Sequence, residues 1–122
     1  DVTVEAQILE LINELKKKFN SAIIFISHDL GVVSEIADKV AVMYSGRIIE
    51  HADVHSIFNQ PKHPYTKGQK LNEIRGVVPS PDEIKEGCRF KTRCDYIKEK
   101  CLTKEPPLKQ VDSNFIRCWL YE

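Results

Sequence analysis

The four cysteines of this 122-residue sequence are the residues whose type and spacing could do chemistry. They are Cys88, Cys94, Cys101 and Cys118, and none of the preceding 87 residues is a cysteine. Thiolates bind soft metals, whereas thiols in an oxidising compartment pair as disulfides. Because all four gather at one end of the sequence, they predict one local site.

The spacing C-x5-C-x6-C-x16-C contains no C-x2-C pair. Structural zinc sites place paired ligands about two to four residues apart, and the common ferredoxin runs also differ from this spacing. The sequence does not open with the basic and apolar regions of a secretion signal, so we expect a reducing compartment. A metal-thiolate site is therefore favoured over disulfides, although the spacing does not name the metal.

The residues around the cysteines suit such a site. Four basic side chains could offset the charge of the thiolates, namely Arg89, Lys91, Arg93 and Arg117. Four aromatic side chains are expected to form an apolar cover over it, namely Phe90, Tyr96, Phe115 and Trp119. Prolines recur from Pro61 onward without a long periodic segment, so this loop-rich tail needs a metal staple.

His28 is a second candidate residue. It follows the run Ala22–Ile26, which is apolar without alternation and predicts a buried strand of a parallel sheet. Loops at the carboxyl end of such strands hold ligands, and an imidazole there can bond a phosphoryl oxygen or an attacking water. A histidine in a loop is also often a plain surface residue. Asp29 is expected to cap the helix that follows Gly31.

Other segments predict the supporting elements. An apolar stripe from Val4 to Phe19 indicates an amphipathic helix, which Asp1 or Thr3 could cap. Strands at 39–44 and 47–50 should form a hairpin around Ser45-Gly46, and a short helix is expected at 56–58. The domain boundary is placed near residue 60.

Composition excludes several functions. Eighteen basic residues balance eighteen acidic ones, which indicates no nucleic-acid partner. The longest apolar run, Ala22–Ile26, is far shorter than the roughly 20 residues that cross a bilayer, so a soluble chain is expected.

Three segments resemble motifs of ABC ATPases in the order of that family. Residues 1–9 resemble the D-loop and its following helix, 24–33 the switch-histidine strand and loop, and 37–50 the next hairpin. The resemblance implies that Asp1 contacts the opposite nucleotide-binding domain. It also implies that His28 senses the γ-phosphate and helps to position water.

Three further segments, at 63–66, 78–81 and 87–90, resemble the C-terminal extension of oligopeptide and dipeptide importer ATPases. That extension is associated with a 4Fe-4S cluster, so the resemblance implies that the four cysteines ligate one, with zinc as the alternative. His63 and Tyr65 are expected to be turn and packing residues rather than ligands.

The sequence also departs from the family. It has no G-x-x-x-x-G-K-[ST] phosphate loop, no signature sequence and no apolar strand that ends in Asp-Glu. We therefore expect a part of a longer subunit that is inactive alone and that uses ATP and Mg²⁺ only when complete. The family has a longer stretch after the 63–66 segment, so residues are expected to be missing between Lys67 and Leu71.

The combined prediction is an α/β fold. Residues 1–60 would be the C-terminal part of a P-loop, ABC-type nucleotide-binding domain, and 61–122 a loop-rich, metal-stapled extension. The resemblance implies a peripheral ATPase subunit at the cytoplasmic face of the membrane, which energises peptide import. Its partners would be the missing N-terminal half, a second ATP-binding subunit and the transmembrane permeases. The alternative is a free-standing metal-binding interaction module.

Overall fold

The computed structural model describes the backbone of residues 2–71 and 76–122. The chain divides into two compact units, of which unit 1 ends at Asp38 and unit 2 runs from Lys39 to Glu122. This division by contacts differs from the predicted boundary near residue 60, which concerns the complete ATPase subunit and stays a prediction. No helix in the described ranges has the length and apolar character needed to cross a membrane.

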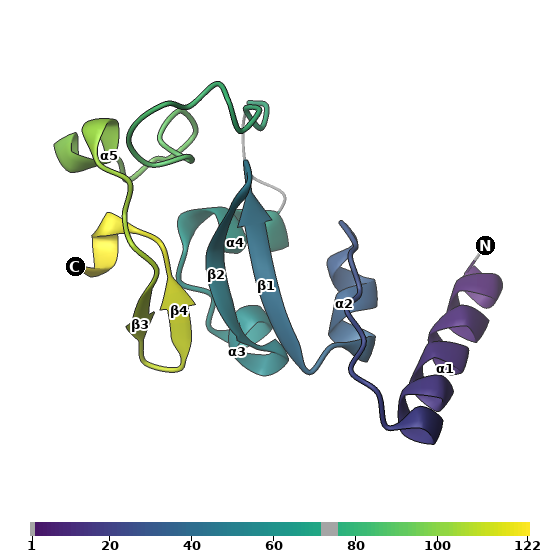
Figure 1. The fold of residues 1–122 in the computed structure, drawn as a ribbon. Coiled ribbons are helices and arrows are strands. Elements are labelled where there is room, and N and C mark those ends of the chain that lie inside the picture. The colour runs from purple at the N-terminus through teal and green to yellow at the C-terminus, as the bar shows by residue number, and fades with distance from the viewer. Residues whose placement is uncertain (1, 72–75) are drawn as a thin grey trace. The chain divides into compact units, whose positions relative to one another are not determined.

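Unit 1 contains the helices α1 (Val2–Phe19) and α2 (Leu30–Ile36), which pack against each other (Figure 1). The helix predicted from the apolar stripe is confirmed, and its last turn carries lysines that oppose the helix dipole. One of them, Lys16, forms an ion pair with Asp38. Thr3 lies inside α1 and is therefore not its cap, while the other predicted cap, Asp1, lies outside the described residues.

Asp29 caps α2, as predicted. Its Oδ1 accepts hydrogen bonds from the backbone N–H of Gly31, at 2.9 Å, and of Val32, at 3.3 Å. These two donors have no partner within the helix, so the carboxylate satisfies the exposed end of α2.

The predicted strand at Ala22–Ile26 is wrong for this structure. The segment forms no strand, and its side chains are partly or almost wholly exposed, with Ile24 91% and Ile26 93% accessible. A strand is defined by its ladder to a neighbour, and the described residues provide no partner for this segment. All strand pairings in the described ranges are antiparallel, so the predicted parallel sheet is also absent from them.

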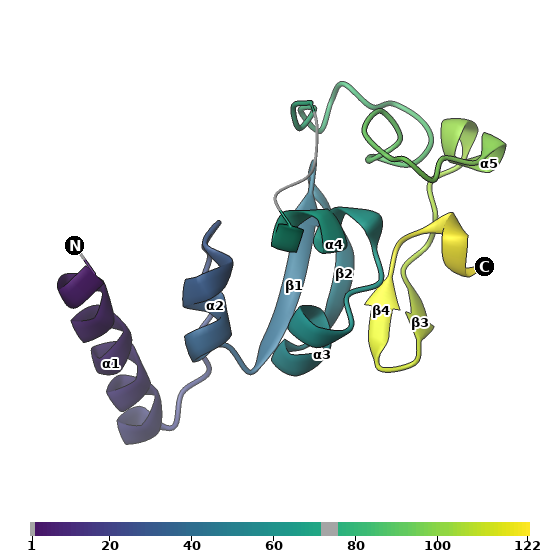
Figure 2. The same ribbon diagram turned by 180° about the vertical axis from the view of Figure 1, so that it is seen from behind.

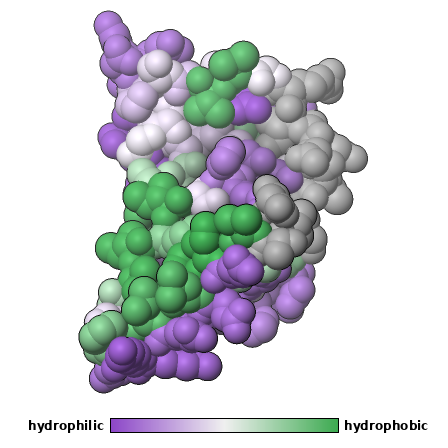
Figure 3. All heavy atoms as spheres, turned by 90° about the vertical axis from the view of Figure 1, so that its right-hand side faces the viewer, coloured by the Kyte–Doolittle hydropathy of each residue, from purple (hydrophilic) through white to green (hydrophobic). Residues whose placement is uncertain are grey.

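Apolar side chains lie uncovered in unit 1. Figure 3 looks from the side on which α1 lies in Figure 1 and shows such side chains gathered in one broad area. Along α1 and the following segment, nine large apolar residues are more than a third exposed: Val4, Ile8, Leu11, Leu15, Phe19, Ile23, Ile24, Phe25 and Ile26. Extended apolar areas of this kind mark surfaces that other protein elements cover.

Unit 2 is built on a four-stranded antiparallel sheet with the order β1-β2-β4-β3. The predicted hairpin is confirmed as β1 (Lys39–Tyr44) and β2 (Arg47–Asp53). Ser45 and Gly46 both have positive φ, 45° and 82°, as the tight two-residue turns of hairpins require.

The tail completes this sheet with two short strands, β3 (Lys109–Val111) and β4 (Asn114–Ile116), which the sequence did not predict. β4 pairs with β2, and the Arg117 N–H donates to the Ile49 carbonyl at 2.8 Å directly after it. The tail is therefore joined to the hairpin through backbone hydrogen bonds, and Cys118 lies one residue beyond the last of them.

Short helices complete unit 2. They are α3 (Val54–Asn59), α4 (Pro64–Leu71), α5 (Glu99–Thr103) and the 3-10 helix η1 (Trp119–Tyr121). The helix predicted at 56–58 is confirmed within α3. Figures 1 and 2 agree that α3 and α4 cover one face of β1 and β2.

An aromatic core connects these elements. Tyr44 at the end of β1, Tyr65 in α4 and Phe90 in the tail are buried, and their ring centroids lie 4.7–5.5 Å apart in edge-on pairs. The side chains of Cys88 and Cys94 pack against this cluster, so the core holds two of the four thiols in place.

Candidate functional site

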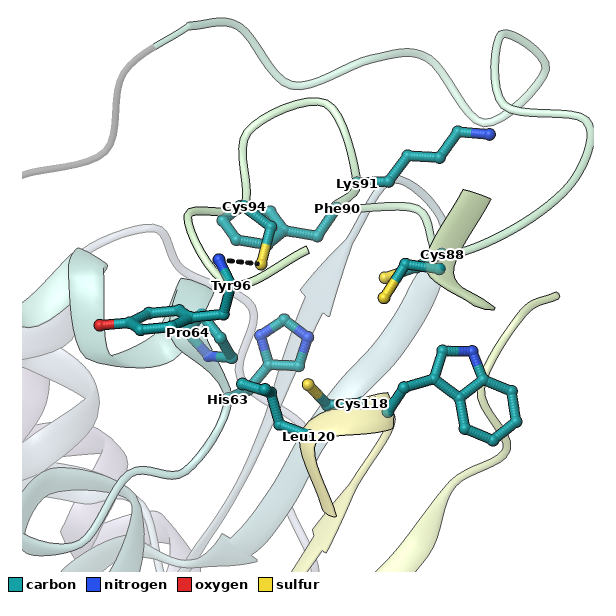
Figure 4. A pocket seen from close by; sticks show the side chains of 11 residues that line it. His63, Pro64, Cys88, Phe90, Lys91, Cys94, Tyr96, Cys118 and Leu120 are labelled. Carbon is teal, nitrogen blue, oxygen red and sulfur yellow. Dashed lines mark hydrogen bonds between the residues drawn. The ribbon is translucent and has the colours of Figure 1, made fainter. Parts of the chain in front are cut away.

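Four separate segments of the tail bring their cysteines to one pocket. Cys88 and Cys94 flank the turns at 89–93, Cys101 lies in α5, and Cys118 follows β4 and precedes η1. All four line the same pocket, which Figure 4 shows from close by. The other side chains of its wall are His63, Pro64, Phe90, Lys91, Tyr96, Trp119 and Leu120.

Backbone contacts fix two of the cysteines against each other. The Cys88 N–H donates to the Cys101 carbonyl at 2.8 Å. Gly87 makes this close approach possible, because it has φ +78° and any Cβ there would lie only 2.4 Å from the Cys101 oxygen. The segment before the first cysteine therefore has to carry a glycine at this position.

Backbone N–H groups point at the sulfurs. The Tyr96 N–H donates to Cys94 Sγ and the Lys98 N–H to Cys101 Sγ, both at 3.4 Å. The N–H groups of Phe90 and Leu120 act in the same way on the other two thiols, Cys88 and Cys118. Such donors stabilise a thiolate more than a thiol, so the backbone is arranged for negatively charged sulfur.

The thiols are also close enough to influence one another. Burial and, to a smaller extent, the other three cysteines raise the pKa of Cys88 to about 11, against a backbone hydrogen bond from Phe90 that lowers it. Burial likewise raises the pKa of Cys94 and of Cys118, again with contributions from neighbouring cysteines. Every pairing among the four appears in these interactions, which places the sulfurs in one group.

The pocket is narrow as it stands. Its cavity has a volume of about 10 Å³, which is roughly the room that one water molecule needs. Among the described residues, no three His, Cys, Asp or Glu side chains are close enough together to hold a metal ion. The thiols thus surround the cavity without closing on one point.

His63 belongs to the wall of this pocket, which the sequence did not predict. The expectation that it and Tyr65 are packing residues is confirmed by their burial, since they are 1% and 9% exposed. His63 Nδ1 accepts the Tyr65 N–H at 3.0 Å, and its ring lies 5.6 Å from that of Phe90. The pocket and the aromatic core therefore share this imidazole.

Glu50 is a second residue that the sequence did not indicate. It is fully buried at the centre of β2, where its carboxylate accepts hydrogen bonds from the backbone N–H of Lys62 and of His63, both at 2.9 Å. It also accepts from Asn114 Nδ2 at 2.7 Å. One carboxylate thereby joins the hairpin, the turn before α4 and β4. A charged residue beside Ile49 in a predicted strand was the one available signal.

Comparisons with known proteins bear on the whole chain. Residues 49–101 match the family described as "Oligopeptide/dipeptide transporter, C-terminal region". The oligopeptide transport ATP-binding protein AppD of Bacillus subtilis is 48% identical over 135 residues, which cover 100% of this chain and 41% of AppD. The dipeptide transport ATP-binding protein DppD of Escherichia coli is 40% identical over 91% of this chain and 38% of DppD. Residues 49–101 therefore resemble an oligopeptide/dipeptide transporter C-terminal region, and the chain spans about two fifths of the length of these relatives.

The match to the oligopeptide/dipeptide transporter C-terminal region contains three of the four cysteines and ends at Cys101. Cys118 lies beyond it, on the segment that β4 attaches to the hairpin. His28 lies before it, exposed in the loop that leads to α2. Asp1 is outside the described residues, whereas the stretch between Lys67 and Leu71, where missing residues were expected, is the end of α4.

The basic side chains that were expected to offset the thiolates do not all face the thiols. Arg47, Arg89 and Arg117 surround the carboxylate of Glu105 at 2.9–3.7 Å. Burial would raise the pKa of Glu105, but its hydrogen bond from Arg47 and the neighbouring arginines hold that pKa below its usual value. Lys91 lines the pocket, yet its Nζ donates to two backbone carbonyls.

The predicted apolar cover over the thiols is confirmed for three aromatic residues. Phe90, Tyr96 and Trp119 line the cysteine pocket. The prediction is wrong for Phe115, whose ring instead lies 5.9 Å from that of His51. Phe115 does not line the pocket, and it pairs with His51 across β4 and β2.

Proposed function

We propose that this chain is the C-terminal part of an ATP-binding subunit that powers the import of oligopeptides or dipeptides. The observation that carries the proposal is the extent of the similarity to proteins with those names. It covers 91–100% of this chain in AppD and DppD, and therefore the residues of unit 1 as well as the tail. A free-standing metal-binding module would not require the resemblance of unit 1 to an ATPase.

The proposed subunit acts as part of a complex. It would bind ATP and Mg²⁺ when complete, pair with a second ATP-binding subunit, and lie at the cytoplasmic face of the membrane against the permease subunits. The uncovered apolar area of unit 1 supports a role for the N-terminal half of the same domain as its cover. His28 would contact the γ-phosphate, and Asp1 the opposite nucleotide-binding domain.

The ATPase role predicts a specific effect of His28→Ala in the complete subunit. We expect ATP binding to persist, because His28 is one contact among many, and turnover to fall about 10²-fold or more, because the lost contact acts on charge at the γ-phosphate. Equilibrium nucleotide binding and phosphate release by the assembled transporter measure the two effects. His55→Ala, which removes another exposed histidine, is the control. Unchanged turnover in His28→Ala would refute the assignment.

We also propose that Cys88, Cys94, Cys101 and Cys118 hold a 4Fe-4S cluster. The donor set fits such a group, because four thiols on four segments surround one pocket and backbone N–H groups point at their sulfurs. The iron would supply the positive charge that the buried thiols need to ionise. The cavity of about 10 Å³ has to widen to admit it.

Cys101→Ser tests this centre. We expect the variant, purified without oxygen, to lose its iron, its sulfide and its broad visible absorption, because one ligand is missing. We also expect the tail to become sensitive to protease, since ligation stabilises a segment with little regular structure. Leu102→Ser on the same helix is the control, because Leu102 is exposed.

The outcome for the parent protein decides between the metals. Brown protein with four irons per chain would support the cluster. Colourless protein with stoichiometric zinc would show that the same four cysteines bind zinc instead. Protein purified without oxygen that holds two disulfides and no metal would refute both the iron-sulfur cluster and the zinc site.

A further inference from the structure

A carboxylate that does not line the pocket joins the segments that carry three of the four cysteines. Glu105 lies shortly after α5, the helix that contains the third cysteine. Its Oε2 accepts a hydrogen bond from Arg89 Nε at 3.4 Å, and its Oε1 lies 3.7 Å from Arg117 Nη1. These two arginines are the direct sequence neighbours of two further cysteines, Cys88 and Cys118. Contacts outside the pocket therefore tie its ligand segments together.

The hairpin belongs to the same junction. Arg47, the first residue of β2, donates from its Nε to Glu105 Oε1 at 2.9 Å. The junction is partly buried, because the side chain of Glu105 is 30% exposed and that of Arg89 only 12%. Hydrogen bonds between charged groups are stronger where water is partly excluded. One carboxylate thus holds the ligand segments at a fixed place on the hairpin.

The guanidinium of Arg117 also determines where the next side chain points. Its Nε donates to the Ile48 carbonyl at 2.9 Å and its Nη1 to the Pro106 carbonyl at 3.2 Å, while its backbone N–H continues the ladder of β4 on β2. The backbone stays extended at Cys118, with φ −157° and ψ 133°. Consecutive side chains of an extended backbone point to opposite sides. An Arg117 held at Glu105 therefore directs Cys118 into the pocket, where Figure 4 shows it.

We propose that Glu105 is a positioning residue of the four-cysteine centre. Through Arg89 and Arg117, it sets the separation of the first and the last cysteine before a metal group binds. The inference rests on the proposed centre, in which Glu105 is not a ligand. Residues that orient the ligands of a metal site change its affinity by about 10–100-fold when they are replaced. Glu105 acts in this way because ligands that are already in place lose less conformational freedom on binding.

Glu105→Gln isolates the charge of this carboxylate. The amide has nearly the same volume, so it would replace a residue that only fills space. It keeps one acceptor oxygen, but the three guanidinium groups would face one another without a counter-charge. Glu99→Gln is the matched control, because it changes an exposed glutamate of α5. Asn114→Ala is a second control, because it removes the hydrogen bond to Glu50 and loosens β4 without changing the arginine junction.

The experiment measures the release of iron to a chelator from the complete subunit, purified without oxygen; where the parent holds zinc, the release of zinc is measured in the same way. We expect Glu105→Gln to release metal about tenfold faster or more, and Glu99→Gln to match the parent. Hydrogen exchange of the metal-free subunits then follows the Cys88 N–H, which donates to the Cys101 carbonyl. Glu105→Gln should speed exchange at Cys88. Asn114→Ala should speed it in β4 but not at Cys88.

The results distinguish this inference from the proposals on which it rests. Equal metal release from Glu105→Gln and the parent would overturn the positioning role but leave the centre in place. Equal exchange at Cys88 in Glu105→Gln and Asn114→Ala, or an unprotected Cys88 N–H in the metal-free parent, would also overturn it. Parent protein without any metal would refute the proposed centre and this inference with it. The ATPase role is tested separately, by His28→Ala.

Discussion

Gly87→Ala is expected to disrupt the cysteine pocket, with a loss of about 3–5 kcal/mol in the free energy of unfolding of the tail. The new Cβ would lie 2.4 Å from the Cys101 carbonyl oxygen and 2.6 Å from that of Leu102. Both are backbone atoms of α5 and cannot turn aside as a flexible side chain would. The positive φ of 78° adds strain of its own.

Gly76→Ala is the matched control, because Gly76 also has a positive φ, of 89°. An added Cβ there would meet the Arg93 side chain at 3.4 Å, which is ordinary contact, so only the strain of about 1–2 kcal/mol remains. The difference in the free energy of unfolding between the two variants therefore measures the cost of the backbone clash at Gly87.

A tryptophan in the tail allows the unfolding of this segment to be followed by fluorescence. Trp119 is the single tryptophan of the sequence, and it lines the pocket with its Nε1 donating to the Lys104 carbonyl at 2.8 Å. Urea unfolding followed by its fluorescence therefore reports on the tail. Equal midpoints for Gly87→Ala and Gly76→Ala would show that the close approach of the 87–88 segment to α5 is absent in solution.

Glu50→Ala is expected to be the most damaging single change outside the tail, with a loss of about 3–4 kcal/mol in the free energy of unfolding. It removes an acceptor from the buried N–H groups of Lys62 and His63 and from the amide of Asn114. These groups would stay buried without partners, and a cavity would remain between β2 and β4.

Two further variants give this prediction its control. Glu50→Gln keeps the side-chain volume but turns an amide NH₂ toward at least one donor. We therefore expect its free energy of unfolding to lie between that of Glu50→Ala and that of the parent. Glu83→Ala removes an exposed glutamate and should stay within about 0.5 kcal/mol of the parent. The same fluorescence titration measures all three. A parent-like midpoint in Glu50→Ala would contradict the role of this carboxylate as the junction of three segments.

Features decided by near neighbours in the sequence could be predicted. The stripe of α1 follows the helical period, Ser45-Gly46 adopts the positive φ angles of a hairpin turn, and Asp29 caps α2. Each depends on interactions within about four residues along the chain, so the residue types contain the necessary information.

The segment Ala22–Ile26 shows where such prediction fails. Its apolar pattern describes a strand that is covered on both faces, but a strand exists only when a partner supplies hydrogen bonds. The tail shows the opposite case, because β3 and β4 are too short and polar to be recognised and form by pairing with β2. In both places, a remote segment decides the structure.

The clustering of the four cysteines in the tail, after an amphipathic helix and a hairpin, could be predicted from the residues, as could the resemblance of the motifs to peptide-importer ATPases. The folded chain was needed to show that the thiols surround one pocket, that backbone N–H groups meet their sulfurs, and that Glu50 fixes His63 in the pocket wall. The physical reason is that hydrogen bonds of buried groups depend on distance and direction, and residues as far apart as Glu50 and Asn114 acquire these only when β2 and β4 pair.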